Sequence, residues 1–171
     1  MEQAVVVTNF LGTSRASTEA FKTANLLKTL TVNALIYGEN GTGKLTLARY
    51  ILPNAPILST QNFDELLEAI NNNSEIIITH VEDATNLKRL IDTIVESKTR
   101  VIDTSNDSVQ TELLQDTFSV RIHIPLLSER REDVKPLLEL LMEDASKINV
   151  EEKPYVMPNY DLYLSQNAVS L

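Results

Sequence analysis

Three glycines within six residues, followed at once by a lysine, constrain this chain more than any other feature of its sequence. Residues 38–44 read Gly-Glu-Asn-Gly-Thr-Gly-Lys, follow the apolar run 32–37 and precede a helical segment from Lys44 to Tyr50. This is the G-x-x-x-x-G-K pattern in the strand–loop–helix context that it requires. The glycines let the backbone turn its N–H groups inward, and the helix N-terminus and Lys44 add positive charge. The loop therefore predicts binding of a nucleotide or phosphate.

The predicted ligand is ATP or ADP, bound without strong help from Mg²⁺. The Ser or Thr that normally follows the lysine and binds Mg²⁺ is replaced by Leu45. Thr46 comes one residue later, rotated by about 100° around the helix, so it does not simply replace that hydroxyl. A glycine-rich strand-to-helix turn with no ligand is the competing interpretation. The predicted binding residues are Gly38, Glu39, Asn40, Gly41, Thr42, Gly43, Lys44, Leu45 and Asn106, the last for a reason given below.

Composition excludes several classes of protein. The chain has 171 residues, which favours one main domain, and its net charge of −9 disfavours binding to nucleic acids or anionic lipids. It has no cysteine, which rules out disulfides, thiolate metal sites and cysteine nucleophiles and favours a reducing cytoplasm. No apolar run approaches the roughly 20 residues needed to cross a bilayer. We expect a cytoplasmic protein without a membrane segment.

Strand-like and helix-like segments alternate along the chain. In two of the helix-like segments, 63–70 and 87–94, apolar residues recur at helical spacing. Asn62 and Thr85 stand just before these segments and are predicted to be their N-caps. A further helix is expected after Arg131, ending near residues 149–153. This alternation is typical of an α/β fold with a parallel sheet of about five strands flanked by helices. The expected strands are residues 32–37, 56–59, 75–79, 100–104 and 120–124.

Four ordered blocks carry a family resemblance. Residues 11–14 read LGTS, residues 34–44 read ALIYGENGTGK, residues 100–106 read RVIDTSN and residues 121–134 read RIHIPLLSERREDV. They resemble elements of the AAA+ domain of the NtrC-type enhancer-binding proteins, the bacterial activators of sigma-54 RNA polymerase, over about residues 10–148. The resemblance implies an AAA+-type P-loop fold. It also implies that Asn106 occupies the sensor position of the nucleotide site.

Departures from the family pattern fall on the residues that perform its chemistry. Thr79 and His80 stand where the family has the Walker B Asp that orients the metal and the Glu that activates water. Residues 110–118, which match the segment that supplies arginine fingers, contain no arginine; losing a finger typically costs ~10³–10⁵ in rate. We interpret Glu82 and Asp83 as solvated turn and helix-start charges. The resemblance therefore implies no catalytic residues.

Parts that bind partners in the family are missing as well. The GAFTGA loop that contacts sigma-54 has no counterpart after residue 60, and neither the GNVREL sensor element nor a helix-turn-helix follows the last helix. We expect a P-loop domain over residues 1–127. Residues 128–171 are expected to hold a truncated helical lid and a tail, whose part 154–171 the pattern does not assign.

We predict structural roles, and no metal or nucleic-acid site, for the two histidines and for the adjacent arginines Arg130 and Arg131. A metal site would need His80 and His123 to converge with carboxylates, and one histidine does not supply the anionic field that holds Mg²⁺, so we predict no metal site. Arg130 and Arg131 are followed directly by two acidic residues. A helix start with local charge pairing is therefore favoured over a nucleic-acid patch.

These observations predict a degenerate AAA+-type module with little or no hydrolysis, in which ATP or ADP is a structural or signalling ligand. A regulatory or homologous AAA+ protein is the expected partner, without direct binding to nucleic acid or membrane. Two alternatives stay open: a slow Mg²⁺-dependent ATPase completed by a partner, and an inhibitory partner of a full-length sigma-54 activator.

Overall fold

The described part of the chain is built around one parallel sheet of five strands. The computed structural model describes residues 13–106, 114 and 117–146. The strands lie in the order β2-β3-β4-β1-β5, and every neighbouring pair is parallel. This confirms the predicted α/β sheet, and the largest boundary difference is that the first strand begins at residue 34 instead of 32. The strands are β1 (Ala34–Tyr37), β2 (Ile57–Ser59), β3 (Glu75–Thr79), β4 (Arg100–Ser105) and β5 (Val120–His123).

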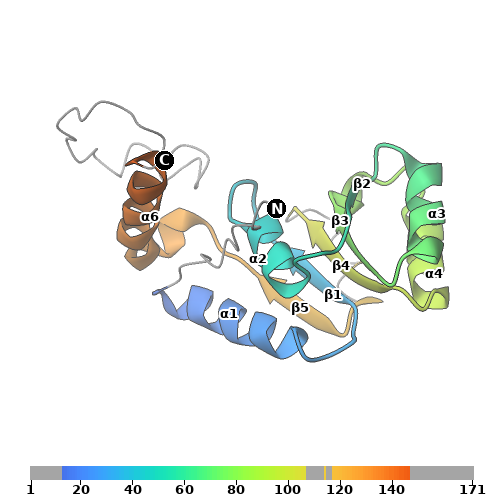
Figure 1. Ribbon diagram of the computed structural model, residues 1–171, viewed down its shortest axis with the longest axis horizontal. Coiled ribbons are helices and arrows are strands. Elements are labelled where there is room, and N and C mark those ends of the chain that lie inside the picture. The colour runs from blue at the N-terminus through green and yellow to red at the C-terminus, as the bar shows by residue number, and fades with distance from the viewer. Residues whose placement is uncertain (1–12, 107–113, 115–116, 147–171) are drawn as a thin grey trace, which may run out of the picture.

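Helices cover both faces of the sheet, because parallel neighbours need crossover connections that pass over a face. Figure 1 shows α3 (Phe63–Asn72) and α4 (Leu87–Glu96) side by side on one side of the strands. The helices α1 (Arg15–Leu27) and α2 (Lys44–Ile51) pack on the other face. Helix α1 had not been predicted from the apolar pattern.

Each face of the sheet has its own apolar core, and burial on both faces explains why the strands read as continuous apolar runs. The core beneath α1 and α2 includes Ala24, Leu27, Ala34, Ile36, Leu47, Ala48, Ile51, Ile77, Ile102 and Ile122. The core beneath α3 and α4 includes Leu35, Leu66, Ile70, Ile76, Ile78, Leu90, Ile94 and Val101. All six residues of the central strand β4 are buried, among them the carboxyl of Asp103.

The two expected N-caps behave differently from the prediction. Helix α4 is capped by Asn86, whose side chain accepts a hydrogen bond from the Arg89 backbone N–H at 3.0 Å, so the prediction of Thr85 was wrong by one residue. Asn62 does occupy the N-cap position of α3. Its side chain, however, donates to Glu65 at 2.6 Å and makes no capping bond.

After β5 the chain forms two short 3₁₀ turns and then α6 (Val134–Ser146). Val134 and Leu138 of α6 pack against Leu127 in a small separate cluster. The expected helix end near 149–153 and the tail 154–171 lie outside the described residues. Among the residues that are described, no helix combines the length and apolar character needed to cross a bilayer.

Candidate functional site

The glycine-rich loop, residues 38–44, lies at the carboxyl end of β1, the strand between β4 and β5. Ligands of open parallel sheets bind at this edge, outside the carboxyl ends of the strands. The loop passes directly into α2, whose first residue is Lys44. The free N–H groups of the first helical turn therefore point toward the same edge.

Backbone geometry explains the first and last glycine of the loop. Gly38 has φ of 150°, and a Cβ added there would lie 2.3 Å from the carbonyl oxygen of Ile124 in the neighbouring chain segment. Gly43, at the N-cap of α2, has φ of 100°. Residues that carry a side chain rarely adopt backbone conformations with such positive φ angles, so both positions require glycine.

Lys44 folds back over the loop. Its Nζ donates to the carbonyl oxygens of Gly38 at 2.7 Å and Glu39 at 2.8 Å, and to Oδ1 of Asn106 at 3.1 Å. Burial lowers the pKa of Lys44, against the raising influence of nearby Glu82 and Glu39. An ammonium has three donors, so a phosphate at this place would have to exchange for some of these acceptors.

Asn106 comes directly after β4 and joins Lys44 to a third residue. While its side chain accepts from Lys44, its backbone N–H donates to Oε1 of Glu82 at 2.8 Å. The structure thus brings together the two residues that the sequence had assigned to the loop and to the sensor position. Their role in binding a ligand stays a prediction.

Glu82 is the main correction at this site. It had been interpreted as a solvated turn charge, but it is 6% exposed and lies in the short 3₁₀ turn Val81–Asp83 after β3. The turn is fixed by Thr60, whose hydroxyl donates to the carbonyl oxygen of His80 at 3.0 Å. Asp83 is exposed, in keeping with the prediction.

A cavity of about 490 Å³, here called the loop cavity, opens beside the loop. Leu45 and Thr46 both reach it, and so do Thr79 and His80 from the end of β3. No carboxylate is among these four residues, so the positions that match the family's Walker B acids present a hydroxyl and an imidazole. The lining residues are Asn40, Gly41, Gly43, Lys44, Leu45, Thr46, Ile57, Thr79, His80 and Thr104.

Arg130 holds the backbone of the glycine-rich loop, through a contact that the apolar and charge patterns did not reveal. Its Nη2 donates to the Thr42 carbonyl oxygen at 2.6 Å and its Nε to that of Pro125 at 3.0 Å. Its Nη1 lies 3.6 Å from Asp133, and both side chains are buried. The pairing agrees with the predicted local charge pairing. Arg130 itself is only 5% exposed.

Asp133 connects this arginine to the start of α1. Its carboxylate accepts the backbone N–H groups of Thr13 and Ser14, both at 2.7 Å, and the hydroxyls of Ser14 at 2.8 Å and Ser17 at 2.5 Å. Burial acts to raise the pKa of Asp133, but the hydrogen bonds from Ser14, Ser17 and Thr13 outweigh it and hold the pKa below its usual value. The family resemblance marked this block, though not its contacts.

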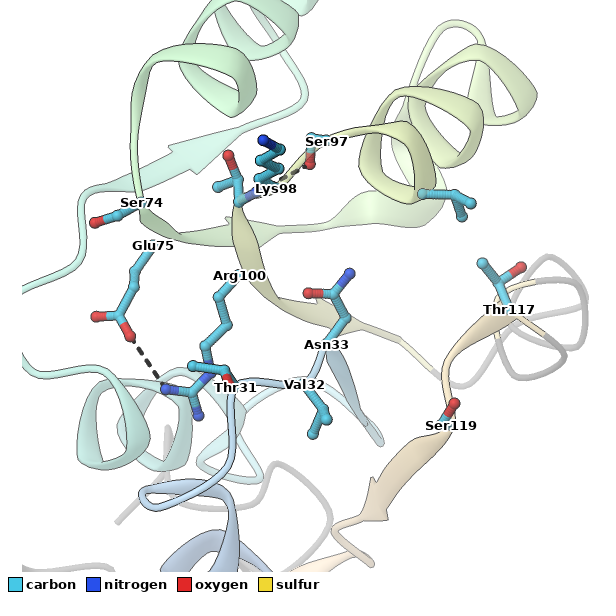
Figure 2. Close-up of a pocket in the computed structure, with 12 residues that line it drawn as sticks. Thr31, Val32, Asn33, Ser74, Glu75, Ser97, Lys98, Arg100, Thr117 and Ser119 are labelled. Carbon is cyan, nitrogen blue, oxygen red and sulfur yellow. Dashed lines mark hydrogen bonds and ion pairs between the residues drawn. The ribbon is translucent and has the colours of Figure 1, made fainter.

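A second hollow, of about 600 Å³, lies at the opposite end of the strands, next to their amino ends (Figure 2). Figure 2 shows Glu75 and Arg100 reaching toward each other, and their ion pair measures 3.1 Å. Arg100 also donates to the carbonyl oxygen of Leu27. These contacts tie β3 and β4 to the end of α1, away from the glycine-rich loop. Although the hollow is larger, the loop cavity is the better candidate because it lies at the carboxyl ends of the strands.

The remaining predicted positions are less informative. His123 on β5 stacks on Tyr37, with ring centroids 5.0 Å apart, and belongs to no group of metal-binding side chains in the described residues. The predicted loss of arginine fingers concerns residues 110–118, most of which lie outside the described part of the chain. Residues 11 and 12 of the LGTS block also lie outside it.

Comparison with known proteins identifies the fold. No family model matches the chain, and no curated protein matches it. NtrX from Brucella abortus is 17% identical, with 94% of this chain and 48% of that one covered and a TM-score of 0.70. NtrX crystallised with ADP gives 18% identity, coverages of 91% and 46%, and a TM-score of 0.69. AMPPCP-bound DnaA from Aquifex aeolicus gives 16% identity, coverages of 84% and 56%, and a TM-score of 0.55.

These neighbours are AAA+ proteins, and at such low identity the likeness concerns the fold. The chain spans about half the length of the NtrX chains that it matches. It therefore has the same α/β P-loop fold as these proteins. The fold that the sequence resemblance implies agrees with these structures.

Proposed function

We propose that this chain is a regulatory or scaffolding module that binds ATP or ADP at the glycine-rich loop and hydrolyses it weakly or not at all. One observation carries the proposal: Gly41, Gly43 and Lys44 line one cavity, where Thr79 and His80 present no carboxylate. Asn106 is joined to this cavity through its hydrogen bond with Lys44. The first set suits phosphate binding, whereas activating water for hydrolysis calls for a general base and a well-held Mg²⁺ ion.

The bound molecules of the structural neighbours support the choice of ligand. NtrX has been crystallised with ATP and with ADP, and DnaA with AMPPCP. All three ligands carry the phosphates that a glycine-rich loop binds through its N–H groups and its lysine. ADP is the better ligand for a binding test on this chain, because its binding does not depend on the residues that hydrolysis requires.

Calorimetry with ADP, in the presence of a chelator and then of Mg²⁺, tests the binding step. The wild type is expected to bind one ADP per chain, and Lys44→Ala is expected to weaken binding by at least about tenfold, since it removes a charge-assisted hydrogen bond. Lys88→Ala, which removes an exposed lysine on α4, is the matched control. Thermal unfolding gives a second readout, because ligand at about 100 times its Kd stabilises by about 2.7 kcal/mol. Absence of ADP binding by the wild type would remove nucleotide from the function.

A slow ATPase completed by a partner is the second candidate, and buried Glu82 favours it. This carboxylate is linked to Lys44 through Asn106, so it lies close to the place expected for the phosphates. The candidate predicts Mg²⁺-dependent phosphate release that Lys44→Ala and Glu82→Gln both abolish. A flat assay across protein concentrations and with added homologous AAA+ protein would exclude it.

The proposed partner is a regulatory or homologous AAA+ protein, in one form a full-length sigma-54 activator that this chain inhibits. The support is the AAA+ fold together with the sequence resemblance to the sigma-54 activators. Size-exclusion chromatography of this chain with such an activator is expected to give mixed oligomers. Two separate peaks at all mixing ratios would contradict the inhibitory form.

A further inference from the structure

The turn after β3 gathers three side chains that can bind a metal. One ligand atom from each of His80, Glu82 and Asp83 lies within 4.8 Å of those of the other two. No other group of three His, Asp or Glu side chains meets this condition in the described part of the chain. A metal site was not predicted from the sequence because one histidine does not supply the anionic field that holds Mg²⁺, and Glu82 and Asp83 were interpreted separately as solvated charges.

The surroundings of the Glu82 carboxylate are a second observation in favour of a metal site. Its Oε1 accepts the Asn106 N–H at 2.8 Å and lies 3.9 Å from Nδ1 of His80. Its Oε2 is fully buried and has no hydrogen-bond partner in the described structure. A buried carboxylate oxygen without a partner is costly and calls for an explanation, of which a bound ion is one. A cation bound by His80 and Glu82 would give Oε2 of this carboxylate the partner that it lacks.

The geometry allows such an ion after small movements. Ligands of Zn²⁺ lie about 2.0–2.2 Å from the metal, so two ligand atoms on one tetrahedral ion are roughly 3.3–3.6 Å apart. The present separations, up to 4.8 Å, are longer than this by about 1 Å. Glu82 is fixed by burial, but the side chains of His80 and Asp83 are exposed and can rotate toward it.

We propose that His80, Glu82 and Asp83 bind one divalent transition-metal ion of the Zn²⁺ type. An imidazole nitrogen with two carboxylates suits Zn²⁺, whereas Mg²⁺ prefers oxygen ligands in octahedral geometry and gives up its water reluctantly. The two carboxylates balance the charge of the ion. The nearby ammonium of Lys44 is directed to Asn106 and to two loop carbonyl oxygens.

The position of this site links it to the loop cavity. His80 lines the cavity together with Lys44, and three protein ligands leave the fourth position of a tetrahedral ion open. A phosphate oxygen can take that position. This link to phosphate rests on the nucleotide binding proposed above, whereas binding of the metal alone does not.

The test is calorimetric titration of the tag-free, chelator-stripped full chain with Zn²⁺ in the absence of nucleotide. One ion per chain is expected. His80→Asn and Glu82→Gln are each expected to weaken Zn²⁺ binding by at least about tenfold. Replacing a residue that only hydrogen-bonds to a metal ligand already lowers metal affinity by about that factor. Asparagine suits position 80 because His80 has φ of 55°, a conformation that asparagine tolerates. Glutamine keeps an oxygen that can accept from Asn106.

His123→Asn is the matched control, because the chain has two histidines and His123 lies on β5, outside the cluster. It is expected to leave Zn²⁺ binding unchanged, and thermal unfolding checks that each variant is folded. The proposal is overturned if the wild type does not bind Zn²⁺, if His80→Asn and Glu82→Gln bind it as the wild type does, or if equimolar Mg²⁺ displaces it. ADP binding measured in chelator is independent of these results, so the failure of one proposal can be told from the failure of the other.

Discussion

Replacing Asp103 by asparagine is expected to stabilise the protein more and more as the pH rises from about 4. Asp103 lies in the middle of β4, opposite Leu35 of β1 and Ile78 of β3, and is completely buried. Both carboxyl oxygens lack hydrogen-bond partners in the described structure. Burial raises the pKa of Asp103 well above its usual value, since the charged form loses its hydration and gains no partner.

The sign and size of the effect follow from linkage. Between the unfolded pKa of about 3.9 and the higher folded pKa, the folded protein holds a proton on Asp103 that the unfolded chain has released. The free energy of unfolding therefore falls by about 1.4 kcal/mol for each pH unit inside this window. Asparagine has nearly the same shape and no proton to lose, so Asp103→Asn removes that fall.

Urea denaturation of the wild type and Asp103→Asn at about pH 4, 5, 6 and 7 measures the effect. The difference in unfolding free energy between the two proteins is expected to grow with pH, and taking the difference cancels the titration of the other acids. Asp92→Asn removes an exposed carboxyl on α4 and measures the effect of changing the charge of this acidic chain. A difference between the wild type and Asp103→Asn that stays constant from pH 4 to 7 would refute the reasoning.

Three further predictions concern the supports of the glycine-rich loop. Gly38→Ala is expected to lower the free energy of unfolding by at least about 2 kcal/mol, seen in urea denaturation, because the new Cβ meets the Ile124 carbonyl oxygen and the backbone has φ of 150°. Asp133→Asn is expected to cost about 3–5 kcal/mol at pH 7, because it removes the negative charge that faces buried Arg130 at 3.6 Å. The pKa of Asp133 is lowered in the folded protein, so the stability that its carboxylate contributes is present above about pH 4 and is lost as the pH falls through the folded pKa. The difference in unfolding free energy between Asp133→Asn and the wild type should therefore shrink in acid. An undiminished difference would contradict this. Arg130→Lys is expected to weaken ADP binding by about tenfold or more in calorimetry, because the bond to the loop carbonyl at Thr42 is lost, and unchanged affinity would show that this contact does not shape the loop.

Much of the fold could be predicted from local pattern. Strands that are buried on both faces read as apolar runs, and the five runs became the five strands with shifts only at their ends. Helix α1 was missed because its buried face is made partly of Ser17, Ala20 and Ala24, which give a weak apolar stripe. The N-cap of α4 was predicted one residue too early, at Thr85, because threonine also serves as an N-cap and sequence alone does not fix the first helical turn.

The candidate site was predicted only in part. The loop and Asn106 could be found from sequence because one is a contiguous motif and the other follows a recognisable strand block. Glu82 and Arg130 could not be placed in the same way. Each makes its decisive contact with a residue distant in the sequence, Glu82 with Asn106 at 2.8 Å and Arg130 with Thr42 at 2.6 Å.

The sequence by itself therefore determined the class of fold, the glycine-rich loop and the absence of acids at positions 79 and 80, because spacing and residue type are local properties. Only the tertiary structure decided which charged groups leave the solvent. The sheet order sets β4 between β1 and β3, which buries Asp103 and brings Asn106 to the loop. The turn after β3 folds Glu82 beneath Asn106 and leaves His80 at the loop cavity. Burial and charge pairing depend on which chain segments meet, and that is fixed only when the whole sheet and its helices pack together.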